Sequence, residues 1–449
     1  MKVGSAACDT RSRLPKGDRM HLGGVTAYME AQTMTRDFAA LNRLVRALLA
    51  LLLLSACSSA PSGPSGPSGA DSLSALPRAL TVAERDAVSS GNAFALTLLR
   101  AVAPSTTRNV LLSPLSVWTA LGMAMNGAAG ETESEMRRTL GWGARSRVEI
   151  NTAYRDLATL LPSLDPSVSI ANANGVWIRG GFTADTGFVS DLRQYFGAEL
   201  QSVATPQGMF DAVNSWGNAK TKGMVPTVLS EPPPEDLLML LANAVYFEGR
   251  WRNAFDVKDT KPEPFQLEGA AAVTVPMMSR KGGFVAMRNT DITAVELTYG
   301  NSAYSMLVLV PNSGTVDALT ARLDSVTLSA IEAALSPGGE GRVYLPRFSV
   351  RGSLELGPQL RAVGMPRAFS DIAEFPRLAG IPAKLSFVQH GMALQVDETG
   401  TKAAAVTVVG AVLTSLPPSY RVDRPFIFLI RERFAGAILF AGVVRDPRQ

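Results

Sequence analysis

Cysteine and histidine are almost absent from this chain. Its 449 residues include two cysteines, Cys8 and Cys57, and two histidines, His21 and His390. Because both cysteines lie near the N-terminus, the rest of the chain can hold neither a disulfide framework nor a thiolate metal site. A single histidine in that part is too few for a His-rich metal site, and a Ser-His catalytic pair there would have to use His390. We therefore expect no metal ion and no cofactor.

The chain also lacks an excess of one charge beyond its first residues. The formal net charge is +4, but residues 1–57 contain eight Lys and Arg and four Asp and Glu, which leaves 35 of each kind in the remainder. This balance gives no support to a nucleic-acid partner. Walker, Rossmann and GxSxG motifs are missing too, so the sequence points to none of the enzyme classes that those motifs mark.

The N-terminal region has the features of an export signal. Arg43 and Arg46 precede an apolar run over residues 47–54, which is too short to span a bilayer as a helix. The following Leu-Ser-Ala-Cys resembles the bacterial lipobox, in which the cysteine, here Cys57, is lipidated. Residues 1–57 are therefore interpreted as a signal region, with Met34 as an alternative start. Plain cleavage and secretion is the alternative to lipidation.

Residues 58–78, which begin SSAPSGPSGPSG, are predicted to form a flexible tether. Ser58 stands where proteins retained at the inner membrane usually carry Asp. The lipobox resemblance therefore favours an outer-membrane lipoprotein that faces the periplasm or the cell surface. The lipidated N-terminus would be its only contact with a membrane.

The stretch over residues 398–424 can lie in a sheet but is not obliged to. Alternate positions carry small uncharged residues, whereas the charged Lys402 falls on the opposite face. Ala and Gly are poor strand formers, and Pro417-Pro418 cannot continue a central strand. The stretch predicts a loop that can become a strand. Its buried face would consist of Thr401, Ala403, Ala405, Thr407, Val409 and Ala411.

The body, from about residue 79, is predicted to be one mixed α/β domain, because helices come first and strands dominate the end. Ser113 is predicted to cap a helix that follows a short buried strand, and Thr132 with Glu135 fits a capping box for the next helix. Further helices are expected over 80–103, 148–162, 210–222 and 354–363. Strands are expected over 110–112, 169–179, 237–247, 292–299, 304–311, 342–350, 425–432 and 437–447.

Three polar residues of the body each allow two interpretations. Ser113 and Ser116 are either nucleophiles, or a helix cap and a buried hydroxyl. Asn243 lies at the centre of the apolar run over 237–247, where a buried amide must find hydrogen-bond partners. It is either a satisfied core amide or a polar switch.

Five motifs, in order and at matching spacing, resemble the serpins: NVLLSPLSV, LANAVYFEGRW, LPRF, ETGTKAAAVT and YRVDRPFIFLI. The resemblance covers residues 79–449. It implies a single serpin domain, a monomer, with three β-sheets, eight or nine helices and an exposed reactive-centre loop. It also implies an inhibitor of serine proteases rather than an enzyme.

In the mechanism that the resemblance implies, the target protease attacks the loop and forms a covalent acyl-enzyme. The cleaved loop then inserts into the central sheet and carries the protease along before deacylation. Lys402 stands where the family usually has Glu, and we expect little effect on insertion because it faces solvent. The hinge that would insert first comprises Glu398, Gly400, Thr401, Ala403, Ala404, Ala405 and Thr407.

Counting along the loop from Glu398 and back from Pro425 places the reactive bond at Thr414-Ser415. The small, apolar residues before that bond imply an elastase-like or subtilisin-like target and disfavour trypsin-like enzymes. If the bond lies one residue earlier, Leu413 would favour chymotrypsin-like enzymes.

The resemblance also assigns structural roles beneath the central sheet. Ser113, Ser116, Asn243 and His390 match the family's shutter, a buried hydrogen-bond cluster where two strands part, and Trp251 matches the aromatic residue at the breach, where the loop first enters. No basic helical stripe for glycosaminoglycans is visible. Two alternatives to the inhibitor are a non-inhibitory serpin that acts as a binding or carrier protein, and a hydrolase that uses Ser113 and His390.

Overall fold

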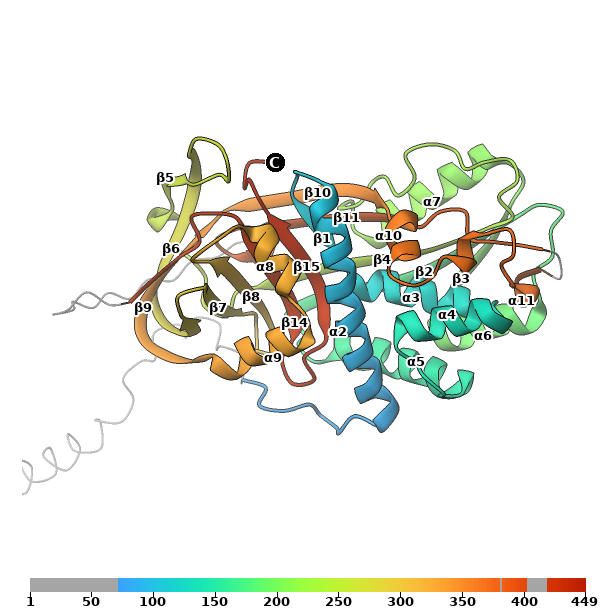
Figure 1. The fold of residues 1–449 in the computed structure, drawn as a ribbon, viewed down its shortest axis with the longest axis horizontal. Helices are drawn as coiled ribbons and strands as arrows, with labels where there is room; N and C mark the ends of the chain where they lie inside the picture. The colour runs from blue at the N-terminus through green and yellow to red at the C-terminus, as the bar shows by residue number, and fades with distance from the viewer. Residues whose placement is uncertain (1–71, 380–381, 402–417) are drawn as a thin grey trace, which may run out of the picture. The chain divides into compact units, whose positions relative to one another are not determined.

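Helices lie mainly in the first half of the chain and strands in the second, as the sequence predicts. The computed structural model in Figure 1 describes residues 72–379, 382–401 and 418–449, which belong to the compact unit Gly69–Gln449. The predicted signal region, the tether up to residue 71 and residues 402–417 lie outside the described residues. None of the helices that are described is both long and apolar enough to cross a bilayer.

Ten α-helices occur in the described part of the chain, and side-chain caps fix where several begin. Thr81 and Glu84 form a capping box at α2, and a second box forms at α5. Ser113 caps α3, as predicted. The helices are α2 (Val82–Val102), α3 (Pro114–Met125), α4 (Gly130–Leu140), α5 (Arg147–Ser163), α6 (Thr186–Phe196), α7 (Pro206–Lys220), α8 (Val316–Arg322), α9 (Ser325–Ala334), α10 (Gly357–Ala362) and α11 (Pro376–Ala379).

The predicted capping box of Thr132 and Glu135 is wrong. Helix α4 begins at Gly130 after Ala129, whose side chain cannot cap it, and the Glu131 N–H of its first turn donates to the Glu374 carboxylate at 3.1 Å. The Thr132 and Glu135 side chains both bind a distant segment instead. The Thr132 hydroxyl accepts a hydrogen bond from the Glu374 N–H at 2.9 Å, and the Glu135 carboxylate accepts one from the Arg367 N–H at 2.9 Å. Because these tertiary contacts occupy both side chains, neither is available as a cap.

The described strands form three hydrogen-bonded sheets. The largest has the order β1-β15-β14-β8-β7-β6-β9-β13, with β5 paired to β6; the second has the order β12-β4-β2-β3, and the third is the pair β10-β11. The strands are β1 (Val110–Leu112), β2 (Val168–Arg179), β3 (Glu199–Val203), β4 (Met239–Arg250), β5 (Lys261–Phe265), β6 (Val273–Arg288), β7 (Ile292–Thr298), β8 (Tyr304–Pro311), β9 (Ser336–Pro346), β10 (Phe348–Glu355), β11 (Gln389–Val396), β12 (Gly400–Thr401), β13 (Ser419–Arg421), β14 (Phe426–Glu432) and β15 (Ile438–Val444).

Several predicted boundaries differ from the structure, three of them for a clear physical reason. The single strand expected over 342–350 is two strands in different sheets, because β9 ends at Pro346, which has no N–H to continue the ladder, and β10 begins two residues later. The helix expected over 354–363 starts only at Gly357, since β10 extends into its first residues. Helix α7 starts at Pro206 rather than at residue 210, because Thr205 caps it.

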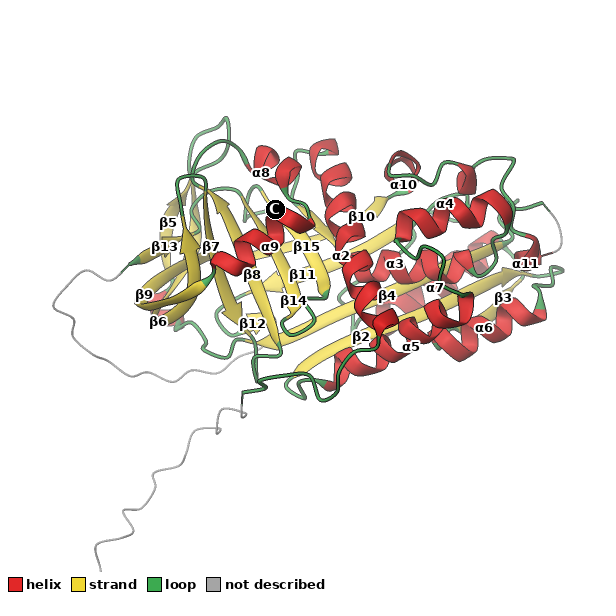
Figure 2. Ribbon diagram, turned by 60° about the horizontal axis from the view of Figure 1, so that its bottom comes forward, coloured by secondary structure: helices red, strands yellow, loops and turns green. Residues whose placement is uncertain are grey.

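Strand β4 lies between two layers of side chains. Helix α3 contacts β4 and β15, whereas α7 contacts β2, β3 and β4. Leu240 and Ala242 of β4 pack in a small cluster with α7, while Leu241, Val245 and Phe247 pack in the main core. Alternate residues of β4 therefore face α7 and the core. In Figure 2 the long strands β2 and β4 run from the strand-rich half of this unit into its helix-rich half.

The segment before α2 is bound to the body. The Leu73 N–H donates to the Asn301 carbonyl at 2.8 Å, and Leu76 and Leu80 pack against the core. Arg78 forms an ion pair of 2.5 Å with the buried Glu84. Residues 73–78, which the sequence placed in the tether, thus lie on the body.

Candidate functional site

Strands β4 and β11 lie next to each other but are not hydrogen-bonded. β4 pairs with β2 along most of its length, and its other edge pairs only with β12, through Thr401 opposite Gly249 and Gly400 opposite Arg250. β11 pairs with β10. Within the described residues, no backbone hydrogen bond joins β4 to β11. Apart from β12, the facing edges of β4 and β11 thus have unpaired backbone groups that an added strand could use, and β12 lies at the entrance.

Gly400 fits this entrance only because it has no side chain. Its φ is +147°, and a Cβ atom there would lie 2.2 Å from the Gly249 carbonyl oxygen and 2.7 Å from the Arg250 Cα. Any other residue would both strain the backbone and collide with β4. The predicted hinge glycine thus lets the chain approach the end of β4.

Aromatic residues hold the chain on both sides of Gly400. The Trp251 N–H donates to the Thr399 carbonyl, and the Trp251 indole N–H donates to the Asp397 carbonyl, each at 2.9 Å. The Trp251 ring stacks on Tyr299 with centroids 4.5 Å apart, and the Tyr299 hydroxyl lies 3.0 Å from the Thr401 hydroxyl. Trp251 therefore lies at the entrance, in contact with the chain on the N-terminal side of Gly400. Tyr299 was not anticipated from the sequence.

Glu398 is a buried carboxylate at the same entrance, 3% exposed. Its Oε1 accepts hydrogen bonds from Arg347 and from the Thr260 hydroxyl, both at 2.5 Å, and its backbone carbonyl accepts one from the Phe255 N–H. Burial alone would raise the pKa of Glu398, but the hydrogen bonds from Arg347 and Thr260 bring it below the ordinary value. The charged carboxylate thus pins the chain just before β12.

Ser113, Ser116, Asn243 and His390 come together beneath the sheet. The Ser113 N–H donates to His390 Nε2 at 2.9 Å, and the Ser113 hydroxyl donates to the Leu439 carbonyl at 3.0 Å. The Ser116 hydroxyl donates to the Asn243 carbonyl at 3.4 Å. These hydrogen bonds join the start of α3 to β4, β11 and β15.

The cluster does not have the geometry of a catalytic pair. The Ser113 hydroxyl is directed to a carbonyl, so His390 does not accept its proton, and a nucleophile needs a base within hydrogen-bond reach. Burial lowers the pKa of His390 to about 4, so the ring is neutral at pH 7. Ser113 is a helix cap, and the hydrolase interpretation has no support from this arrangement.

Asn243 has unmatched hydrogen-bonding capacity. Its Nδ2 donates to Asn172 Oδ1 at 2.5 Å and to Asn174 Oδ1 at 2.7 Å on β2. Its Oδ1 is buried and has no partner among the described residues. The amide is thus only partly satisfied, and its free acceptor lies on the face of β4 that points to the core. The alternating Asn172 and Asn174 of the sequence could have signalled this cross-strand cluster.

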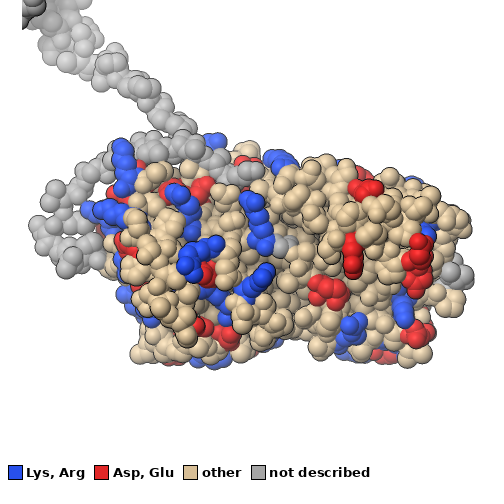
Figure 3. Space-filling model, turned by 90° about the horizontal axis from the view of Figure 1, so that it is seen from above, with Lys and Arg blue, Asp and Glu red and all other residues tan. Residues whose placement is uncertain are grey.

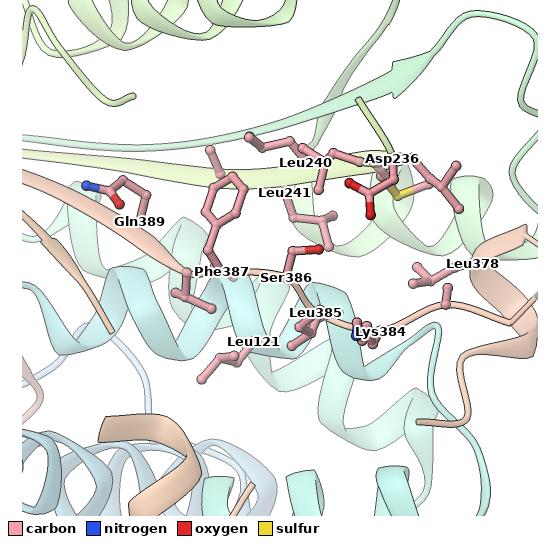
Figure 4. Close-up of a pocket in the computed structure, with 18 of the residues that line it drawn as sticks. Leu121, Asp236, Leu240, Leu241, Leu378, Lys384, Leu385, Ser386, Phe387 and Gln389 are labelled. Carbon is pink, nitrogen blue, oxygen red and sulfur yellow. The ribbon is translucent and has the colours of Figure 1, made fainter. Parts of the chain in front are cut away.

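A cavity of about 280 Å³ continues the line between β4 and β11 at the far end of the sheet (Figure 4). One wall is residues 236–242, which lead into and begin β4, and the other is residues 382–389, which lead into β11. Leu121 lines the floor, and Leu240, Leu385 and Phe387 line the walls. The lining is thus mainly apolar, with charged residues such as Asp236 and Lys384 among it.

The remaining predicted site residues cannot be placed. Ala403, Ala404, Ala405, Thr407, the bond between Thr414 and Ser415, and Cys57 lie outside the described residues. In the part of the chain that is described, no group of three or more His, Cys, Asp or Glu could hold a metal ion.

Comparison with known proteins gives one consistent result. The sequence matches the family described as Serpin (serine protease inhibitor) over residues 89–447. It is 33% identical to Iripin-2 of Ixodes ricinus, covering 83% of this chain and 96% of that protein. It is 30% identical to an uncharacterized serpin-like protein of Thermococcus kodakarensis, covering 81% and 87%.

Solved structures agree with the sequence match. Tengpin, a thermophilic serpin in the native state, superposes with a TM-score of 0.75 and 25% identity, covering 84% of this chain and 97% of that one. Human thyroxine-binding globulin complexed with thyroxine gives a TM-score of 0.75 and 28% identity, covering 82% and 100%. These neighbours confirm the predicted mixed α/β serpin fold. With its ordered motifs and a family match over most of its length, the chain belongs to the serpin family.

Proposed function

We propose that this protein is a suicide-substrate inhibitor of serine endopeptidases. The observation that carries the proposal is the short strand β12. Gly400 and Thr401 pair with the last residues of β4, while the rest of that edge of β4 has no partner among the described strands. The loop after Thr401 therefore starts at the mouth of an open strand position, and cleavage of the loop would free it to continue inward.

The pairing at β12 defines the register of the inserted strand. Because the pair is antiparallel, each step forward along the loop corresponds to one step back along β4. Ala403 would lie opposite Phe247, and Ala405 opposite Val245. Residues directly opposite share a face of the sheet, and these β4 residues face the core. The small alternate residues of the loop would thus enter the core face, where bulk or charge would block insertion.

In this register the far end of the strand would reach this mainly apolar cavity. Residues 408–414 would lie opposite residues 242–236, which form one wall of that cavity. Val409, Val412 and Leu413 could therefore fill it, with burial worth about 1.5–3 kcal/mol for each large side chain. Movement along the length of β4 would carry a protease bound to Thr414 by about 40 Å, at roughly 3.3 Å per residue.

The same register gives Lys402 a partner. It would lie opposite Glu248, on the face of β4 that α7 covers. Glu248 already lies 3.6 Å from Lys222 and accepts a hydrogen bond from Tyr246. A lysine at this position of the loop is therefore favourable in this chain, although the family usually has Glu there.

We assign the target class from the residues before the reactive bond. Thr414, preceded by Val412 and Leu413, fits the small apolar primary pocket of elastase-like or subtilisin-like enzymes, and cleavage after Leu413 would suit chymotrypsin-like ones. We further propose export through the signal over residues 1–57 and anchoring of a monomer to the outer membrane through Cys57.

Incubation with elastase, subtilisin and chymotrypsin tests the inhibitor proposal. A complex that survives SDS, with mass spectrometry placing the bond at Thr414, is the expected outcome. Thr401→Arg, which puts a charge on the core face, should convert the inhibitor into a substrate. Lys402→Arg, a matched control on the other face, should still form the complex. Cleavage by all three enzymes without any stable complex would contradict the proposal.

A carrier function is the alternative, because the fold also matches thyroxine-binding globulin in complex with thyroxine. Thermal unfolding before and after a single cut in the loop separates the two functions. An inhibitor should gain a large increase in Tm, because the cut loop becomes a strand of the sheet. A carrier whose loop does not insert should keep its Tm.

A further inference from the structure

The formally neutral body separates its charges. The strands β5, β6, β9 and β13 together contain six Lys and Arg but only two Asp and Glu. Figure 3 shows a bias of the same kind on one face, where most Lys and Arg lie over the half of the body that carries β5, β6 and β9 in Figure 1. The formal net charge of the body gives no sign of this basic surface.

Three of the cations surround the point where the reactive-centre loop returns to the body, at Ser419. Arg342 lies opposite both Ser419 and Lys281 in the sheet, so these three residues form one rung. Arg288 donates a hydrogen bond of 2.5 Å to the Ser419 carbonyl. Lys281 and Arg288 are exposed, and within the described residues neither they nor Arg342 has an ion-pair partner.

Aromatic rings hold the guanidinium groups in place. Arg342 and Arg421 lie over the same Tyr344 ring, 5.9 and 4.0 Å from its centroid, and Arg288 lies over Tyr420 at 5.2 Å. Cation–π contacts of this kind restrict long side chains before a partner arrives, which lowers the entropy cost of binding. Tyr and Arg are also the residues that dominate binding energy in protein interfaces.

A protease at the reactive bond must come close to this surface. Ser419 follows Ser415 by only four positions along the chain, and an extended chain covers at most about 3.6 Å per residue, so the distance is at most about 14 Å. A protein interface of typical size buries about 800 Å² on each partner, which corresponds to a radius of about 16 Å. A bound protease would therefore overlap the rung at Ser419, on the primed side of its own cleft.

We propose that Lys281 and Arg342, with Tyr344, form a docking surface for an acidic patch beside the primed side of the target protease's active site, and that Arg288, over Tyr420 on the other face of the sheet, extends it around the start of β13. The proposal rests on the inhibitor function and adds a second determinant to the loop sequence. Charge complementarity at such a surface raises the association rate more than the lifetime of the complex. A polyanion is a poorer fit, because a tyrosine lies at the centre of the patch and Arg421 is already paired with Glu263.

The test uses one subtilisin in two surface forms, with carboxylates or with lysines added beside the primed side of its cleft. The second-order rate of loss of the intact inhibitor is measured at low and high salt. The carboxylate form should react about tenfold faster at low salt, and the difference should shrink at high salt because exposed charges are screened. Equal rates for the two forms would overturn the proposal.

Charge-reversal variants then show which side chains cause the difference in rate. Lys281→Glu/Arg288→Glu should remove most of the advantage of the carboxylate form, and Lys281→Glu alone, at an exposed side chain, should remove part of it without affecting folding. Arg193→Glu on α6, an exposed cation at the opposite end of the body in Figure 2, is the matched control and should behave like the parent chain. Variants that leave both rates unchanged but lose retention on heparin would show a polyanion site and refute the proposal.

This readout is independent of the trapping step. Loss of the intact chain is counted whether it ends as a complex or as a cut chain. If cleavage produces no stable complex, the inhibitor function fails, while the charge dependence of the cleavage rate still reports on the docking surface.

Discussion

Replacing Thr407 by Val is expected to weaken the loop-inserted state without changing the intact one. If the register set by β12 continues on insertion, Thr407 would lie opposite Asn243 and on the same face, where Cβ atoms of paired residues are about 4.5–5.5 Å apart. Asn243 Oδ1 is a buried acceptor without a partner among the described residues. The Thr407 hydroxyl could donate to it, and Val has the same shape but no donor.

The expected magnitude follows from the state of that acceptor. A buried acceptor that stays unsatisfied costs about 1–3 kcal/mol, and a neutral hydrogen bond contributes about 0.5–1.5 kcal/mol net. Val also buries a methyl group in place of the hydroxyl, so the single variant mixes two effects. A double-mutant cycle with Thr407→Val and Asn243→Ala cancels the contribution of the extra methyl group. It also cancels the loss of the Asn243 hydrogen bonds to Asn172 and Asn174. We expect a coupling of about 1 kcal/mol in the cut protein and none in the intact protein.

The assay is guanidinium chloride unfolding of all four chains, each intact and after a single cut in the loop. Zero coupling in the cut form would refute the register, as would equal coupling in both forms. The same cycle with Thr407→Ser in place of Val should show a coupling near zero, because Ser keeps the hydroxyl.

Four further outcomes are expected. Glu398→Lys loses the bonds to Arg347 and Thr260 and should lower the free energy of unfolding by about 1–3 kcal/mol, measured in denaturant. Gly400→Ala should disrupt β12, because its Cβ would collide with the Gly249 carbonyl, and the ratio of inhibitor consumed to protease trapped should rise in a titration. Lys402→Glu puts like charges opposite each other at Glu248, which costs about 0.2–1 kcal/mol and should slow insertion in stopped flow, with rescue by Glu248→Lys. The free energy of unfolding should fall as pH falls from 6.5 to about 4, because His390 is protonated in the unfolded chain below pH 6.5 but stays neutral in the folded protein down to about pH 4. The slope is about 1.4 kcal/mol per pH unit, and His390→Gln should flatten it in unfolding curves taken across that range.

Much of this fold can be predicted from short local sequence patterns. The cap at Ser113, the buried strand before it and the final pair β14 and β15 follow from residues that are neighbours in sequence. The predicted capping box at Thr132 was wrong because its hydroxyl binds Glu374, which lies more than 230 residues away in the sequence. Local patterns predict local partners, and tertiary contacts override them where a side chain is buried.

The candidate site was only partly predictable for the same reason. The resemblance grouped Ser113, Asn243 and His390, which no spacing in the sequence connects. It did not supply the partners of Glu398, because Thr260 lies 138 residues away and Arg347 lies 51 residues away. Such pairs have no local periodicity, so a single sequence carries no signal for them.

The contacts at the entrance also determine which face of the inserted loop is buried in the core. A slip of one residue would exchange the two faces of the inserted strand. Lys402 and Val406 would then enter the core in place of Thr401 and Ala405, and burying an unpaired ammonium group costs several kcal/mol. Period two alone does not prevent this slip. The ion pair of Glu398 and the fit of Gly400 against β4 fix the first rung before insertion starts, so the entrance sets the register in which the sequence of the loop can be buried.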